Sequence, residues 1–260
     1  MKNARLLQNQ TALITGASRG IGASLAAELA AQGADVAVVA RTLDAHPTLP
    51  GSLRETTAAI EAQGRRAVAV VADLSDADER ARIVPAAAEG LGGPVEILVN
   101  NAAAAIYQPV AAFPLKRRRL IFEVNVHAPL DLAQAVVPAM VDAGEGWIVN
   151  VSSASARTRS APFPATALGA TIGVYGASKA ALNRLSNALA EELWGSGVRV
   201  NTVEPRNAVR SEGAEALVGG ALADDLYESM EDMVAGALLL CDAPPEWTGG
   251  THVSLDLLGR

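Results

Sequence analysis

Short runs of Val, Ile, Leu and Ala recur along the chain, separated by longer stretches whose apolar residues have helical spacing. Most of the short runs lack alternation of polar and apolar positions, which is typical of strands buried on both faces of a sheet. The short runs predict seven strands, at residues 11–15, 35–40, 66–72, 95–100, 147–152, 198–203 and 251–255. The longer stretches predict helices over residues 20–32, 52–63, 76–90, 115–142, 175–195 and 226–240.

Strands and helices alternate in this pattern over nearly the whole chain. Successive right-handed strand–helix–strand crossovers build a parallel sheet with helices on both faces. Because no linker, repeat or low-complexity tract divides the sequence, we expect a single doubly wound, Rossmann-type α/β domain over residues 1–260. Residues 154–172 predict an extended loop, and residues 206–223 predict a strand-free segment over the carboxyl ends of the strands, on the substrate side.

Composition narrows the function classes. Half of the residues are apolar, 19% are charged, and the net charge is −7, which disfavours a nucleic-acid partner. The basic run KRRR at 116–119 is therefore interpreted as a solvated helix face. The sequence has a single cysteine and three scattered histidines, so we expect a reducing compartment and no metal site. It shows no signal peptide and no apolar run of eighteen residues, so we expect no membrane span and a soluble cytoplasmic protein.

The stretch TGASRGIG, residues 15–22, lies between the first predicted strand and the first predicted helix. Gly16 permits a tight turn, Gly20 lets backbone N–H groups approach a phosphate, and Gly22 allows close packing of helix on strand. The helix N-terminus then presents its positive dipole end to the phosphates of a dinucleotide. A tight turn without a ligand is the alternative, but the position in a doubly wound domain favours a pyrophosphate site.

Six further motifs follow in order: ADLS (72–75), NNAA (100–103), VNV (124–126), IVNVSS (148–153), YGASK (175–179) and VRVNTVEP (198–205). Together with TGASRGIG they resemble the short-chain dehydrogenases/reductases over essentially the full length. The resemblance implies an NAD(P)-dependent oxidoreductase, with Asp73 and Leu74 at the adenine, Asn101 and Ala102 at the adenosine ribose, and Ala103 in place of the usual glycine. The full cofactor-binding set that it implies is Gly16, Ser18, Arg19, Gly20, Ile21, Gly22, Arg41, Thr42, Asp73, Leu74, Asn101, Ala102, Ala103, Tyr175, Lys179, Pro205, Ala208 and Arg210.

The end of the second strand decides between the two nicotinamide cofactors. An acid there accepts a hydrogen bond from the ribose 2′-hydroxyl of NAD, whereas an arginine binds the 2′-phosphate of NADP. Ala40 stands where NAD-specific relatives carry Asp, Arg41 follows it, and Arg19 lies in the glycine turn. We therefore expect NADP(H) rather than NAD(H), with Arg41 as an ordinary solvated loop residue being the alternative.

Tyr175 and Lys179 lie four residues apart and share one face of the predicted helix. A free phenol has a pKa of about 10, and a neighbouring cation lowers it, so the pair predicts a general acid/base. Lys179 is one of only three lysines in an arginine-rich chain, and the resemblance implies that it also binds the nicotinamide ribose. By the same resemblance Ser153 holds the substrate oxygen, with Ser152 as the alternative. Asn125 supports a proton relay, unless it is a satisfied core amide.

After the sixth strand the sequence departs from the family pattern. Arg206 stands where Gly is usual and Arg210 where Thr is usual, although Arg210 can bind a pyrophosphate. The leading hypothesis is an NADP(H)-dependent oxidoreductase that interconverts a carbonyl and an alcohol on a small, hydrophobic substrate. The alternatives are a non-catalytic NADP(H)-binding redox sensor and a non-redox member of the same family. The resemblance also implies a homo-oligomer, a tetramer or dimer, through helices 115–142 and 175–195.

The segment between Ser153 and Tyr175 holds twenty-one residues. This is roughly nine more than in relatives, and lengthening a surface loop costs little because closure entropy grows only logarithmically. Both ends must still meet at one substrate oxygen, so the surplus has to bulge outward. We expect residues 157–172 to form a flap on the substrate pocket or on a subunit interface.

Overall fold

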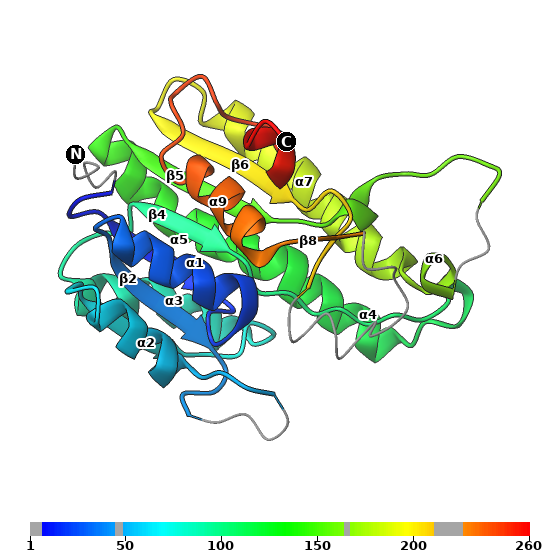
Figure 1. Ribbon diagram of the computed structural model, residues 1–260, viewed down its shortest axis with the longest axis horizontal. Coiled ribbons are helices and arrows are strands. Elements are labelled where there is room, and N and C mark those ends of the chain that lie inside the picture. The colour runs from blue at the N-terminus through cyan, green and yellow to red at the C-terminus, as the bar shows by residue number, and fades with distance from the viewer. Residues whose placement is uncertain (1–6, 45–48, 164–166, 211–225) are drawn as a thin grey trace.

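The computed structural model describes residues 7–44, 49–163, 167–210 and 226–260 (Figure 1). The parts of the two irregular segments at 164–166 and 211–223 lie outside the described residues.

A seven-stranded sheet forms the centre of the fold, and every neighbouring pair of its strands is parallel. The strand order is β3-β2-β1-β4-β5-β6-β9, so the order reverses between β1 and β4. All seven predicted strands are confirmed, with ends that shift by at most two residues. Their bounds are β1 Thr11–Thr15, β2 Asp35–Ala40, β3 Ala67–Val71, β4 Ile97–Asn100, β5 Gly146–Val151, β6 Val198–Glu204 and β9 Thr251–Val253.

Helices cover both faces of this sheet, as expected for a doubly wound fold (Figure 1). Successive strand residues point to opposite faces. Ile14, Val38 and Val99 accordingly pack with one layer of helices, whereas Leu13 and Leu98 pack with the other. The first layer contains α1 Gly20–Ala31, α2 Leu53–Glu61 and α9 Met230–Leu240, and the second contains α3 Ala77–Leu91, α5 Ala128–Ala143 and α7 Gly173–Glu192.

Three predictions need correction. The predicted helix 115–142 consists of α4 Leu115–Phe122, a π-helical turn η2 Glu123–His127, and α5. The last long helix begins at Met230 rather than at 226, because the Ser229 side chain caps it by accepting from Asp232 N. The segment 206–223 is not strand-free: β7 Ala208–Val209 pairs with β8 Tyr227–Glu228. A two-residue strand is too short to leave a periodic pattern in the sequence.

Four short elements complete the described chain: η1 Val110–Ala112, η3 Ala154–Ala156, α6 Ala167–Thr171 and α10 Ser254–Leu257. The extended loop therefore contains a turn of 3₁₀ helix at its start and a short helix near its end. Between them, residues 157–163 are exposed, and Figure 1 shows this part arching away from the sheet beside α6.

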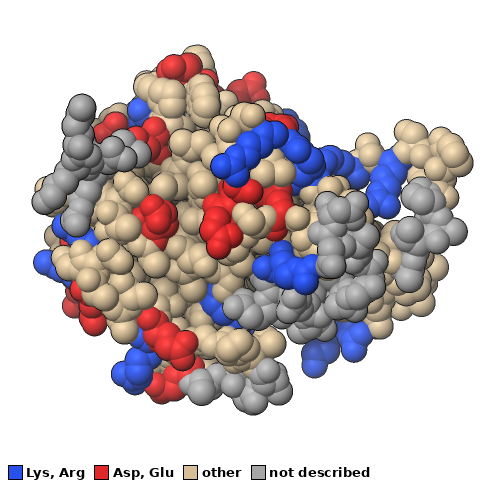
Figure 2. Space-filling view, viewed as in Figure 1, with Lys and Arg blue, Asp and Glu red and all other residues tan. Residues whose placement is uncertain are grey.

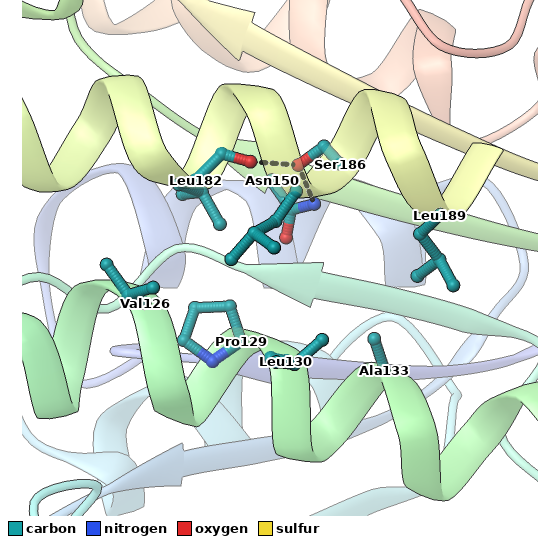
Figure 3. Close-up of a pocket in the computed structure, with 9 residues that line it drawn as sticks. Val126, Pro129, Leu130, Ala133, Asn150, Leu182, Ser186 and Leu189 are labelled. Carbon is teal, nitrogen blue, oxygen red and sulfur yellow. Dashed lines mark hydrogen bonds between the residues drawn. The ribbon is translucent and has the colours of Figure 1, made fainter. Parts of the chain in front are cut away.

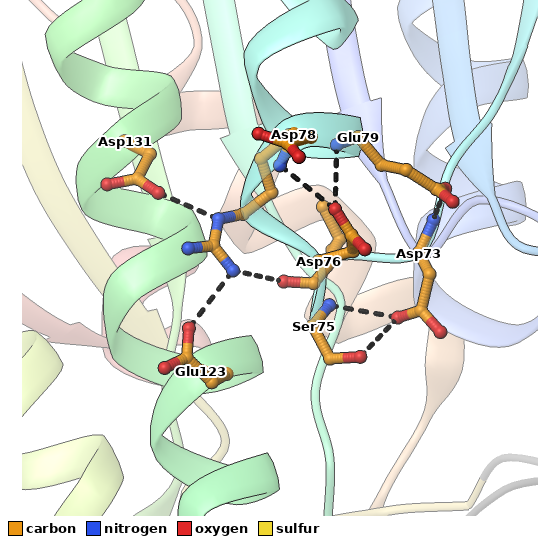
Figure 4. Close-up of polar contacts among 9 residues, drawn as sticks. Asp73, Ser75, Asp76, Asp78, Glu79, Glu123 and Asp131 are labelled. Atoms are coloured by element: carbon orange, nitrogen blue, oxygen red, sulfur yellow. Dashed lines mark hydrogen bonds and ion pairs between the residues drawn. The ribbon is translucent and has the colours of Figure 1, made fainter.

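A buried arginine joins α3 to η2 and α5. Arg80 donates to Glu123 Oε2 (3.1 Å), to Asp131 Oδ2 (2.7 Å) and to the Leu74 carbonyl oxygen (2.8 Å), as Figure 4 shows for its two acidic partners. Because Leu74 follows β3, these bonds fix the end of that strand against the helical segment that contains Asn125.

The surface carries charges of both signs on the face drawn in Figure 2, with Lys and Arg more frequent toward the side of α4 and α6. The KRRR run lies on α4 with its side chains exposed, which confirms the expected solvated helix face. Within the described chain, one helical stretch, Leu115–Ala143, is long and apolar enough to cross a membrane. Of its apolar eighteen-residue window 44% is buried in the protein, and core helices pass the same test, so the stretch is weak evidence for a span.

Candidate active site

The predicted site residues follow the carboxyl ends of six strands that all run in one direction. Parallel strands end at one edge of their sheet, and ligands of open α/β sheets bind at that edge, where the strand order reverses. The glycine turn follows β1 and the NNAA segment follows β4, so they flank this switch point. The fold thus places all the predicted groups along the same edge.

At the switch point the glycine turn lies directly against the end of β4. Gly16 has a φ of +67°, and a Cβ added there would lie 2.8 Å from Ala102 Cα. A Cβ at Gly22 would lie 2.4 Å from Asn101 Nδ2. The Asn101 amide donates to the Thr15 and Gly16 carbonyl oxygens (2.8 and 3.2 Å), and Ala103 is exposed beside this contact. Two of the three glycines are therefore required by close packing.

The N-terminus of α1 differs from those of α2, α3 and α9. Ser52 caps α2, Asp76 caps α3 and Ser229 caps α9, and each of these helices has an acid in its first turn. Among the described residues, no side chain caps α1, and its first turn has no acid. The first backbone N–H groups of α1 therefore suit an anion, which fits the predicted pyrophosphate. Gly20, Ile21 and the buried Ser18 belong to this turn.

The two arginines predicted to select NADP have different surroundings. Arg19 donates to the carbonyl oxygens of Pro50 and Gly51 (2.8 and 3.2 Å), so its guanidinium holds the loop before α2. Arg41 is exposed after β2, next to the half-buried Thr42. Burial alone would raise the pKa of Asp73, but hydrogen bonds from Ser75 and the charge of Arg41 lower it below its usual value. Arg41 is thus the guanidinium that lies close to the predicted adenosine end of the site.

Lys179, Ser153 and Tyr175 meet at the carboxyl end of β5. Lys179 is 1% exposed, and its Nζ donates to the Val151 carbonyl oxygen (2.7 Å) at the end of β5. Ser153 lies two residues beyond this strand, and its side chain forms a hydrogen bond with the Tyr175 phenol. Of the two serines weighed, Ser152 is buried and its hydroxyl has no partner in the described structure. The second serine is therefore the one that contacts the phenol.

Close contact between α7 and η3 brings these groups together. A Cβ added at Gly176 would lie 2.4 Å from the Ser155 carbonyl oxygen, so only glycine allows this approach. Ser155 also donates its hydroxyl to Ser153 Oγ (2.9 Å), while its backbone N–H donates to the same oxygen (3.2 Å). Ser153 is thereby oriented by its own turn.

The electrostatics of the pair differ from the prediction. Burial raises the pKa of the Tyr175 phenol, the nearby Tyr107 raises it further, and the hydrogen bond with Ser153 lowers it only in part. Burial also lowers the pKa of Lys179 to about 8. The pKa of the phenol is therefore raised where the sequence predicted a lowering, because the loss of water disfavours the charged form of each group.

Asn125 lies in the π-helical turn and is fully buried. Its Oδ1 accepts from Ala104 N (2.7 Å), and its Nδ2 donates to Ala104 O (3.0 Å) and to Ser178 Oγ (3.0 Å). The side-chain amide thus joins the segment after β4 to α7. A proton relay would have to use the second lone pair of Oδ1 or the backbone, so that role stays a prediction.

Both arginines that depart from the family pattern after β6 have partners in the structure. Arg206 donates to Asp256 Oδ1 (2.6 Å) and to the carbonyl oxygen of Arg260 (2.7 Å), near the C-terminus of the chain. The Arg210 guanidinium lies 4.7 Å from the centre of the Tyr227 ring. Pro205 is buried and Ala208 begins β7. The substitution of Gly by Arg206 therefore has a structural reason, a link to α10.

An ion pair joins the start of the extended loop to the end of β6. Arg157 Nε donates to Glu204 Oε1 (2.6 Å), and the other guanidinium nitrogens donate to the carbonyl oxygens of Arg206 (3.2 Å) and Pro205 (3.3 Å). The Glu204 side chain is only 4% exposed, whereas that of Arg157 is 45% exposed. This clamp links the two segments that flank the predicted substrate side.

Replacing Arg157 by Ala should lower the free energy of unfolding by about 1–3 kcal/mol, because it leaves the buried Glu204 carboxylate without its ion partner. The measurement is urea unfolding at neutral pH. Arg159→Ala, at an exposed position of the same loop, is the matched control. Equal effects of the two variants would contradict the role of the clamp. Adding Glu204→Gln to Arg157→Ala should recover part of the loss.

Several contacting residues were not among the predicted ones. Tyr107, seven residues after the end of β4, packs against Tyr175 with ring centres 5.8 Å apart. Ser155 orients Ser153, and Ser178 bonds to Asn125. Ser178 stands inside YGASK, so its motif could have indicated it. Tyr107 had no such signal beyond its place in a loop at the carboxyl edge.

A separate groove lies between the helical segment 126–133 and α7. Figure 3 shows Leu182, Ser186 and Leu189 of α7 facing Val126, Pro129, Leu130 and Ala133, with Asn150 between them. Asn150 donates to Ser186 Oγ (2.8 Å) and accepts from Asn100 Nδ2 (2.9 Å). None of the four predicted catalytic residues lines this groove, which is distinct from the candidate active site.

Comparison with known proteins gives consistent matches. The family profile described as short chain dehydrogenase matches residues 10–216. Hydroxysteroid dehydrogenase-like protein 2 of Danio rerio is 31% identical over 260 residues, covering 100% of this chain and 60% of that protein. This chain thus spans about 60% of the length of that relative.

Two solved structures have the same fold. A short chain dehydrogenase of Mycobacterium thermoresistibile has a TM-score of 0.83 and 31% identity, covering 97% of this chain and 87% of that one. The 3-oxoacyl (acyl-carrier-protein) reductase of Agrobacterium tumefaciens C58, solved with NADP bound, has a TM-score of 0.80 and 29% identity, covering 97% and 95%. The chain belongs to the short chain dehydrogenase family.

Proposed function

We propose that this protein is an NADP(H)-dependent oxidoreductase that interconverts a carbonyl and an alcohol on a small, hydrophobic substrate. The observation that carries the proposal is the convergence of Tyr175, Ser153 and Lys179 at the carboxyl end of β5, next to the switch point of the sheet. NADPH, when bound, supplies the hydride to the carbonyl carbon.

In this proposal Tyr175 gives its proton to the carbonyl oxygen as the alcohol forms. A phenol whose pKa is raised by the loss of water around it stays protonated at neutral pH, which suits a proton donor. Ser153 donates a hydrogen bond to the same oxygen and holds it beside the phenol. Lys179 lies one helical turn away from Tyr175, binds the nicotinamide ribose, and is charged below a pH of about 8. Asn125 holds the segment after β4 against α7 and supports the proton relay.

The cofactor proposal rests on the N-terminus of α1 and on Arg41. The first turn of α1 suits the pyrophosphate, and the arginine after β2 suits a 2′-phosphate, since no acid ends that strand. The NADP-bound relative from Agrobacterium supports the same cofactor. The Arg19 guanidinium contributes through the Pro50–Gly51 loop that it holds.

Replacing Arg41 by Ala should weaken NADPH binding about tenfold, because one charge-assisted contact to the 2′-phosphate is lost. NADH binding should stay within about twofold, since NADH has no such phosphate. Fluorescence titration of both cofactors measures the two dissociation constants. Arg82→Ala on α3 removes the same charge from an exposed position and serves as control. A wild-type preference for NADH, or an equal loss for both cofactors in Arg41→Ala, would contradict this cofactor assignment.

The substrate class is tested by following NADPH oxidation with a panel of carbonyl compounds. The names of the relatives suggest that a steroid ketone and a 3-oxoacyl thioester belong in the panel beside small apolar ketones. Turnover of any of them supports the proposal. Tight NADPH binding without turnover of any carbonyl or alcohol would favour the redox sensor instead. Arg206, the departure that motivated the sensor, is bonded to Asp256 rather than to the candidate site.

Two further parts of the proposal concern the surface. The exposed residues 157–163 form a flap on the substrate pocket or a contact between subunits. The groove on α7 and the facing helical segment belongs to a homo-oligomeric interface, in a dimer or tetramer. The first rests on the exposure of residues 157–163, and the second on the resemblance, which implies contacts through helices 115–142 and 175–195.

A further inference from the structure

Tyr107 is the second phenol at the candidate active site. Its ring meets the Tyr175 ring edge-on, with centres 5.8 Å apart and planes at 69°. Edge-to-face packing of this kind is favourable and directional, because the positive edge of one ring faces the negative face of the other. The ring of Tyr175 is therefore restrained by a neighbour outside its own helix.

The segment that carries Tyr107 is anchored on both sides of it. The backbone N–H and carbonyl of Ala104 both bond to the Asn125 amide (2.7 and 3.0 Å). Four residues later, Gln108 N donates to the Thr171 carbonyl oxygen (2.9 Å) at the end of α6. Tyr107 lies between these two attachments, one to the helical segment before α5 and one to the end of the extended loop.

We propose that Tyr107 is a positioning residue for Tyr175, holding its ring edge-on so that the Tyr175 hydroxyl stays directed at Ser153. The proposal rests on the proposed function, in which Tyr175 is the proton donor. The extended loop then helps to position Tyr175, since α6 at the end of that loop supplies one of the two attachments of the Tyr107 segment.

The electrostatic environment supports the same arrangement. Burial raises the pKa of Tyr107 as well as that of Tyr175, and an ionised Tyr107 opposes ionisation of Tyr175. Ser153, the residue before η3, bonds to the Tyr175 phenol, and Ser155 bonds in turn to Ser153. Tyr107 lies against the Tyr175 ring, and Lys179 follows one turn later on α7. Removing the Tyr107 hydroxyl should therefore lower the pH at which Tyr175 ionises.

The first test uses the small number of tyrosines. The chain has three, Tyr107, Tyr175 and Tyr227, so 3-fluorotyrosine labelling gives three ¹⁹F resonances that single Tyr→Phe variants assign. Tyr107→Leu should shift and broaden the Tyr175 resonance, whereas Tyr107→Phe, which keeps the ring, should leave its width unchanged. An unchanged Tyr175 resonance in Tyr107→Leu would overturn the proposal.

The second test is kinetic. Tyr107→Leu should lower kcat about tenfold or more, with the NADPH dissociation constant within about twofold of wild type. Tyr107→Phe, which keeps the ring, should restore kcat. Wild-type kcat in Tyr107→Leu would overturn the positioning role. If the wild type reduces no carbonyl, the proposed function fails, while the NMR measurement still decides whether Tyr107 restrains Tyr175.

Discussion

Replacement of Tyr175 by Phe should lower kcat for carbonyl reduction by about 10²–10⁴-fold, the range that a positioned general acid contributes. The variant keeps the ring, so the edge-on contact with Tyr107 persists while the proton donor is lost. The NADPH dissociation constant should change by less than about threefold, because one hydroxyl contact to the cofactor ribose accounts for little of the binding free energy. Steady-state kinetics and cofactor titration measure the two effects separately.

Tyr227→Phe is the matched control, since it removes one hydroxyl and keeps the ring beneath Arg210. Its kcat should equal that of wild type. Activity of Tyr175→Phe above a tenth of wild type would mean that another group delivers the proton. Tyr107 would then be the first candidate, and the double variant Tyr107→Phe, Tyr175→Phe would decide.

Replacement of Lys179 by Met should raise the stability of the protein and lower its activity. Lys179 is buried without a carboxylate partner among the described residues, and burial lowers its pKa from the usual 10.5 to about 8. Burying the charged form therefore costs folding free energy that an apolar side chain of similar length avoids. We expect the variant to gain about 1–3 kcal/mol in the free energy of unfolding at pH 7, while kcat falls by about 10²-fold or more.

The gain should depend on pH. Below a pH of about 8, Lys179 is protonated in both the folded and the unfolded chain, so the full cost is present. Between about 8 and 10.5 the unfolded chain binds more protons at this position, so wild-type stability rises with pH and the difference from Lys179→Met shrinks. Urea unfolding at pH 7 and pH 9.5 measures this change.

Lys116→Met, at an exposed position of α4, is the control and should show neither effect. A Lys179→Met protein less stable than wild type at pH 7 would contradict the cost assigned to this buried charge. It would show that the hydrogen bond from Nζ to the Val151 carbonyl oxygen contributes more than the burial removes.

The sheet could be predicted almost completely from the sequence. Runs such as DVAVVA at 35–40 are almost entirely apolar, because both faces of a central strand are covered by helices. Burial on both faces can therefore be recognised from consecutive residues. The edge strand β3 is partly exposed, yet its run of Ala and Val still marked it. The pair β7 and β8 could not be predicted, since two residues leave no periodicity and their partners lie outside their own segment.

The candidate site, too, could be predicted only in part. The glycine turn, YGASK and the serine after β5 are local patterns, and the carboxyl edge of a parallel sheet collects them by topology. The contact of Tyr107 with Tyr175 joins residues sixty-eight positions apart, and the Arg157–Glu204 pair joins residues forty-seven apart. No local pattern encodes such pairs, because they depend on how two loops meet.

The sequence by itself therefore determined the strand and helix pattern, the glycine turn at the first helix and the order of the motifs, all of which rest on neighbouring residues. Only the tertiary structure decided which serine meets the phenol, where Arg19 and Arg206 direct their charges, and how the pKa values of Tyr175 and Lys179 move. The physical reason is that burial and the distances between remote side chains set these properties. Both exist only once the chain is packed.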